Sequence, residues 1–180
     1  MIEAGAAFLA WVGAALVVLS DGRRGLAVGL AIATFGLGAI VLLHAGPLEA
    51  ALVALGGAAG AARRWTSGVP GWGTMPAGST PRFVLCVATA LVGVWFALIV
   101  TTGAGADLKF AALVAVALSG ARVLSSADPD VLLTAVGLLA LAAAAAAGPA
   151  ETASGAWPYA LAALIAAGAC WVRPGSLDAA

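Results

Sequence analysis

Seven apolar segments, separated by short breaks rich in glycine, proline and charge, constrain the fold of this chain more than any other feature. They are Ala4–Ser20, Leu26–His44, Leu48–Ala62, Phe83–Thr102, Leu108–Ala121, Val131–Gly148 and Trp157–Val172. A helix needs roughly 20 predominantly apolar residues to cross the hydrocarbon core of a bilayer. The pattern therefore predicts an all-α, polytopic integral membrane bundle with about seven transmembrane helices. The third and fifth segments are short, and they span only if flanking residues reach to the interface or the bilayer thins.

The scarcity of charge supports the same fold class. Only 9% of the residues are charged, whereas a soluble globular domain carries about 25%. Too little polar material is present to cover a soluble fold, but a bilayer accepts an apolar outer surface. We therefore expect a single transmembrane domain over residues 1–180. Because Glu3 and no basic residue precedes the first apolar segment, that segment lacks the pattern of a signal peptide and is expected to remain.

The basic residues predict the orientation of the chain. If the N-terminus lies outside, one side of the membrane holds only Lys109, and the other side holds Arg23, Arg24, Arg63, Arg64, Arg82, Arg122 and Arg173. Cytoplasmic loops carry an excess of Lys and Arg, so the C-terminus is predicted in the cytoplasm. Omitting either short helix would place arginines on both sides, which favours seven spans. The high alanine and glycine content, with a single lysine, is typical of a GC-rich bacterial genome and suggests a bacterial cell membrane.

One longer break, residues 63–82, is predicted to be an irregular cytoplasmic loop. It contains Pro70, Pro76 and Pro81 together with several glycines, which oppose a regular helix. Its tryptophans are expected at the membrane interface, where aromatic rings gather. Long loops are often functional, so we expect any soluble partner to bind here. The candidate partner-binding residues are Trp65, Trp72, Arg63, Arg64 and Arg82.

Three polar residues on the predicted outer side are weak candidates for function. His44 and Glu49 flank the turn between the second and third segments, and a His near a carboxylate can relay protons because its pKa lies near neutrality. Glu49 and Lys109 begin similar stretches and could form an ion pair. The alternative for each is an interfacial side chain at a helix end, in contact with water and with no partner.

The sequence contains no pattern that predicts an enzyme, a metal site or a cofactor site. The central parts of the seven segments lack Asp, Glu, Lys, Arg and His, which mark ion pathways in membranes. Asn and Gln are absent from the chain, so its interior polar groups are hydroxyls such as those of Thr34, Thr89, Ser119 and Thr134. Cys86 and Cys170 form no CxxC pattern and are predicted to be reduced core residues.

Two functions remain from this reading. The first is a structural or accessory subunit of a membrane complex, which needs apolar helix faces and no chemistry of its own. The alternative is a small transporter or channel for an apolar or very small substrate, favoured by a weak repeat of one helix followed by three hairpins. The expected partners are membrane lipid and other membrane subunits. A net charge of zero argues against nucleic acid.

Overall fold

The computed structural model describes residues 1–75, 78–100, 106–147 and 155–172. Within these ranges the regular structure is helical, and each predicted apolar segment corresponds to one helix. The helices are α1 (Ile2–Leu19), α2 (Arg23–His44), α3 (Pro47–Thr66), α4 (Thr80–Val100), α5 (Ala106–Ser125), α6 (Pro129–Ala147) and α7 (Trp157–Trp171). An isolated bridge between Ser20 and Thr74 is the nearest approach to a strand in the described chain. The predicted all-α class is confirmed. Arg173, one of the arginines predicted on the cytoplasmic side, lies outside the described residues.

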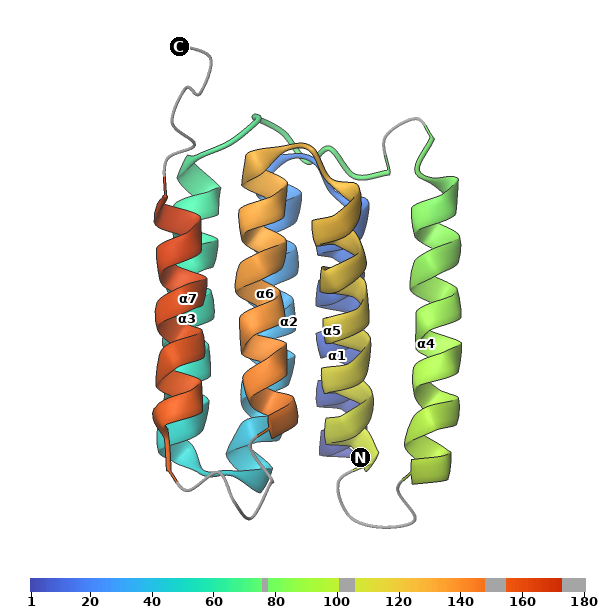
Figure 1. Cartoon of the computed structure of the whole chain (residues 1–180), viewed down its shortest axis with the longest axis vertical. Helices are drawn as coiled ribbons and strands as arrows, with labels where there is room; N and C mark the ends of the chain where they lie inside the picture. The colour runs from blue at the N-terminus through green and yellow to red at the C-terminus, as the bar shows by residue number, and fades with distance from the viewer. Residues whose placement is uncertain (76–77, 101–105, 148–154, 173–180) are drawn as a thin grey trace.

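Six of the helices form two layers, and the seventh stands at the side (Figure 1). One layer contains α1, α2 and α3, and the other contains α5, α6 and α7. Helix α5 packs on α1, α6 on α2, and α7 on α3, while α4 flanks the bundle against α5 and α1. Successive helices run in opposite directions, so the turns alternate between the two ends. The arginines at the starts of α2 and α4 and in the last turns of α3 and α5 consequently gather at one end, which we call the basic end.

The lengths and composition of the helices indicate a multi-pass membrane protein. Four helices, α1, α2, α5 and α6, are each long and apolar enough to cross a bilayer. The segment Thr80–Phe96 of α4 and the whole of α7 are shorter apolar helices. Helix α3 has Glu49 in its first turn and Arg63 and Arg64 in its last turn, which lowers its hydropathy.

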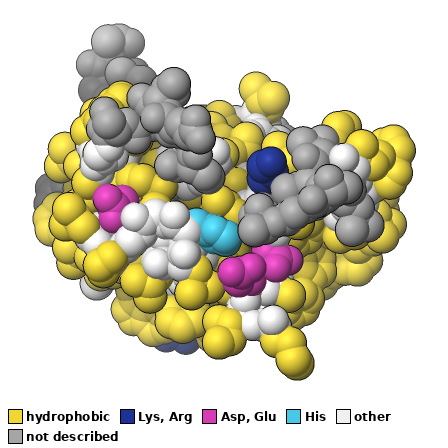
Figure 2. Space-filling view, turned by 90° about the horizontal axis from the view of Figure 1, so that it is seen from below, with side chains coloured by type: hydrophobic (Ala, Val, Ile, Leu, Met, Phe, Trp, Pro, Cys, Tyr) yellow, Lys and Arg dark blue, Asp and Glu magenta, His cyan; other side chains and the backbone are white. Residues whose placement is uncertain are grey.

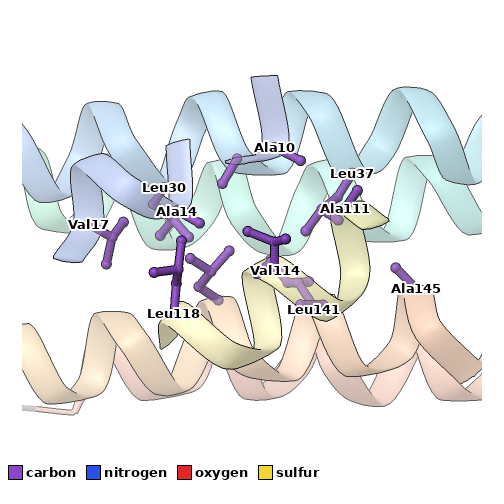
Figure 3. Close-up of a cluster of buried hydrophobic side chains, with 14 of the residues drawn as sticks. Ala10, Ala14, Val17, Leu30, Leu37, Ala111, Val114, Leu118, Leu141 and Ala145 are labelled. Atoms are coloured by element: carbon purple, nitrogen blue, oxygen red, sulfur yellow. The ribbon is translucent and has the colours of Figure 1, made fainter. Parts of the chain in front are cut away.

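Small residues let the helices approach closely. A Cβ atom on Gly13 of α1 would lie 2.1 Å from the backbone nitrogen of Ala33 in α2, and one on Gly56 of α3 would lie 2.5 Å from the Cα of Ala163 in α7. Between the layers, Figure 3 shows aliphatic and alanine side chains from α1, α2, α5 and α6 filling the space. In lipid, such close van der Waals packing is a main source of helix association.

The irregular segment after α3 is shorter than predicted. Helix α3 continues through Arg63 and Arg64 to Thr66, and α4 begins at Thr80, which leaves residues 67–79 between them. The prediction over residues 63–82 was wrong at both ends for physical reasons. Arginines are favourable in the last turn of a helix, and Pro81 stands at the start of α4, where its missing N–H does no harm.

This connecting segment is attached to the turn between α1 and α2. The backbone N–H groups of Arg23 and Arg24 donate to the carbonyls of Val69 and Gly71, at 2.9 and 3.1 Å. These carbonyls satisfy donors at the start of α2 that have no partner within the helix. Gly73, at φ +52°, allows the approach, because a Cβ there would lie 2.4 Å from the nitrogen of Gly22. The segment therefore caps α2 rather than lying free at the surface.

Candidate functional site

The strongest polar feature of the described chain is a pair of buried arginines at the basic end. Arg64 is in the last turn of α3, on the face that carries Gly57 and Gly60 into the bundle, and it is 1% exposed. Its guanidinium donates to the carboxylate of Asp130, in the first turn of α6. Asp128 lies just before α6, and its carboxylate accepts the N–H of Asp130 at 2.8 Å. Asp128 thus caps the start of α6.

The second buried arginine, Arg122, is also 1% exposed and lies in the last turn of α5. Its guanidinium donates to the Asp21 carboxylate and, at 3.2 Å, to the Ser20 carbonyl. The guanidinium of Arg82, near the start of α4, donates to both carboxylate oxygens of Asp21 at 3.2 Å. A single carboxylate in the α1–α2 turn thus joins α4 and α5 to the first layer.

Both buried pairs cross between the layers, one from α3 to α6 and the other from α5 to the α1–α2 turn. Burying a guanidinium is costly, and the cost is recovered only when its partner and further hydrogen bonds are in place. Further hydrogen bonds offset only part of this cost, because some guanidinium nitrogens are buried without a hydrogen-bond partner in the described structure. These are Nε and one terminal nitrogen of Arg64, and Nε of Arg122. The two carboxylates are therefore essential to the burial of the arginines.

The predicted partner-binding residues separate into buried and exposed groups. Arg64 and Arg82 are held by Asp130 and Asp21, so their charges are directed into the fold. The guanidinium of Arg63 lies 5.7 Å from the ring centroid of Trp171, a cation–π contact. Trp65 and Trp72 are half exposed, at 52% and 51%. Sequence reasoning missed the roles of Arg122 and Asp21, whose only signal was a charge at the end of an apolar helix.

The opposite end carries the weak polar candidates (Figure 2), and we call it the acidic end. His44 Nε2 lies 3.8 Å from an Oε1 of Glu3, so its nearest carboxylate is in α1 and not Glu49. Among the described residues, Glu49 and Lys109 do not form an ion pair with each other. The structure does bring the only histidine together with the only tyrosine, Tyr159.

His44 and Tyr159 border a small space between the layers, with Val41, Ala45, Leu108 and Ala145 completing its wall. The space has no room for a water molecule. His44 and Tyr159 therefore lie close together in a closely packed part of the acidic end.

Between the two ends, the interior hydroxyls are used locally. Thr34, Ser119 and Thr134 donate to the carbonyls of Leu30, Ala115 and Asp130, four residues earlier on their own helices. The hydrogen-bond donor of such a hydroxyl is already used within its own helix, so it is not available to bind a solute. Over the described ranges, no group of three His, Cys, Asp or Glu side chains is placed to hold a metal ion.

Open apolar grooves run along the sides of the bundle. One lies between α4 and α5, lined by Thr89, Val92, Gly93, Phe96, Leu113, Val114 and Ala117. Others follow the contact of α4 with α1 and the contact of α2 with α3. All three grooves lie on the outer surface of the bundle and have predominantly apolar linings.

Comparison with known proteins gives no relative: no protein-family model, no curated protein and no solved structure matches the chain.

Proposed function

We propose that the chain is a seven-span membrane protein that serves as a structural or accessory subunit of a membrane complex. Its N-terminus lies outside the cell and its basic end faces the cytoplasm. The observation that carries the proposal is a contrast between the interior and the surface. The interior is filled by apolar side chains and its hydroxyls bond to their own helices, whereas α4 exposes large apolar side chains on its outer faces.

The charges at the two ends support seven spans. The six arginines within the described chain lie at the basic end, and Lys109 lies at the acidic end. Because Lys and Arg stay on the cytoplasmic side during insertion, this separation supports spans by α3 and α4 as well. In the sequence, Arg173 follows α7 and extends the same count to that helix. The ion pairs of Arg64 and Arg122 then lie near the cytoplasmic interface, where water lowers the cost of the buried charges.

The packing of α4 supports the subunit role. In its described side chains, α4 buries Cys86 and Gly93, which are seven residues apart and lie on one helix face. Its other faces expose large apolar residues, among them Leu91 at 67% and Trp95 at 61%. The grooves that α4 forms with α5 and with α1, of about 200 and 230 Å³, leave room for side chains of a neighbouring transmembrane helix. Their linings contain no charged residue. Apolar faces with small residues are what helix association in lipid requires.

A photo-crosslinking experiment in native membranes tests the subunit role. We place p-benzoylphenylalanine at Leu91 in α4 and, as a matched control, at Leu164 in α7, which is 72% exposed. The subunit role predicts a discrete protein adduct from the α4 position and lipid adducts alone from the α7 position. Lipid adducts alone from both positions would contradict it.

The alternative, a small transporter or channel for an apolar or very small substrate, is favoured by one observation. The ion pairs between the layers are at the basic end, whereas the described contact of His44 with Glu3 stays within one layer. Layers joined at one end could separate at the other, as alternating access requires. Spin labels at Ala45 and Ala146 would show two distances for a transporter and one narrow distance for a subunit.

A further inference from the structure

An open groove between α2 and α3 begins just below the basic end. Its lining is formed by Ala27, Val28, Ala31, Ala61, Ala62 and Trp65, and its volume is about 220 Å³. The small side chains make a shallow channel parallel to the helices, on the surface that faces lipid. The exposed ring of Trp65 stands at its upper limit, in the last turn of α3.

A basic residue, Arg24, lies one turn above this groove on α2. Arg24 precedes Ala27 and Val28 by three and four residues and Ala31 by seven, so all four share one face of α2. Arg24 is exposed, and among the described residues no carboxylate lies within ion-pairing distance of it. Arg64, Arg82 and Arg122 differ, because aspartates at the same end neutralise them.

A backbone hydrogen bond fixes the main chain at Arg24. The N–H of Arg24 donates to the Gly71 carbonyl at 3.1 Å, and the adjoining Trp72 is half exposed. Tryptophan is enriched where lipid headgroups meet the acyl chains. The groove therefore has an apolar floor, the ring of Trp65 at its upper limit and Arg24 one turn above it on α2. This arrangement complements a molecule with an anionic head and an apolar tail.

We propose that this groove binds one anionic phospholipid of the cytoplasmic leaflet, with its phosphate at Arg24 and an acyl chain against Ala27, Ala31 and Ala61. The site rests on the membrane location of the chain and is independent of whether the protein is a subunit or a transporter. A basic residue near the membrane surface contributes about 1 kcal/mol to the binding of anionic lipid, which corresponds to about fivefold in affinity.

Native mass spectrometry of the full chain tests the site. The protein is reconstituted in nanodiscs of phosphatidylcholine with a minor fraction of phosphatidylglycerol, released, and examined for retained lipid. The wild type should retain one phosphatidylglycerol in preference to phosphatidylcholine. Arg24→Gln should weaken this retention about fivefold, and Ala31→Trp, which fills the groove, should abolish it.

Two matched variants separate this site from general charge and bulk effects. Lys109→Gln removes a cation at the acidic end, and Ala117→Trp fills the groove between α4 and α5; both should retain the lipid as the wild type does. Millimolar inorganic phosphate should not displace it, because the acyl chain contributes to binding. Equal retention of the two lipids by the wild type, displacement by phosphate, or an equal loss in Lys109→Gln would overturn the proposal.

Discussion

Asp130→Asn should lower the free energy of unfolding by about 3–5 kcal/mol, the cost of removing one partner of a buried ion pair. The asparagine keeps the shape of the side chain but leaves the guanidinium of Arg64, which is 1% exposed, without a counter-charge. Asp130 is the one carboxylate paired with Arg64 in the described chain, so the substitution removes its counter-charge. Unfolding by SDS in mixed micelles, followed by tryptophan fluorescence, measures the loss.

Asp128→Asn is the matched control for this prediction. It makes the same change of charge two residues earlier, at a position whose carboxylate caps α6 by accepting the N–H of Asp130. Asparagine caps helices about as well as aspartate, so the expected loss is below about 1 kcal/mol. The double variant Arg64→Met with Asp130→Leu should recover most of the stability, because apolar residues often replace a buried pair without loss. Equal losses in the two asparagine variants would contradict the account of Arg64.

Asp21→Asn should cost about 2–3 kcal/mol, because it leaves the buried Arg122 without its carboxylate. The expected loss is smaller than for Asp130, since the Asp21 side chain is 39% exposed and water solvates part of the site. The same change removes the contact of Arg82 and should loosen both α4 and residues 67–75. Hydrogen exchange of Arg23 and Arg24 amides, which donate to that segment, should rise along with the loss of stability.

Arg82→Gln separates the two arginines that meet at Asp21. Arg82 is 33% exposed, so its pair with Asp21 resembles a surface ion pair, worth at most about 1 kcal/mol. The structure predicts that Arg82→Gln has much the smaller effect on unfolding. A loss as large as that of Asp21→Asn would mean that the α4 contact, and not the burial of Arg122, dominates the cluster.

The helices could be predicted from the sequence because each depends on local properties. An apolar segment bounded by residues such as Gly46-Pro47 or Asp128-Pro129 specifies a helix and its start without reference to the rest of the chain. The grouping of arginines followed from counting turns. The end of α3 could not be fixed in this way, since an arginine serves equally well in the last turn of a helix and in a loop.

The contacts between distant residues could not be predicted, because nothing local determines them. Arg64 and Asp130 are 66 positions apart, and Arg122 and Asp21 are 101 apart. From the sequence alone, each arginine could equally be a side chain that extends to water or one that is buried in an ion pair. The sequence suggested Glu49 as the carboxylate near His44 because the two are neighbours in the chain. The structure instead places His44 nearer Glu3 in α1. The docking of residues 69–75 uses backbone groups, which leave no side-chain pattern to detect.

The central claim is that seven helices cross the membrane with the basic end in the cytoplasm, and accessibility of single thiols tests it directly. Cys86 and Cys170 are 2% and 1% exposed, so the unmodified protein should give almost no labelling from either side and serves as the blank. Introduced cysteines are placed at three exposed positions: Ala45 at the acidic end, and Thr66 and Ala127 at the basic end.

In intact cells, an impermeant maleimide should label Ala45→Cys, whereas Thr66→Cys and Ala127→Cys should react only after the membrane is permeabilised. Ala45 and Thr66 lie at opposite ends of α3, the helix with the weakest claim to span. Labelling of both Ala45→Cys and Thr66→Cys from outside would show that α3 does not cross and would contradict the seven-span arrangement. Labelling of Thr66→Cys and Ala127→Cys alone would reverse the orientation.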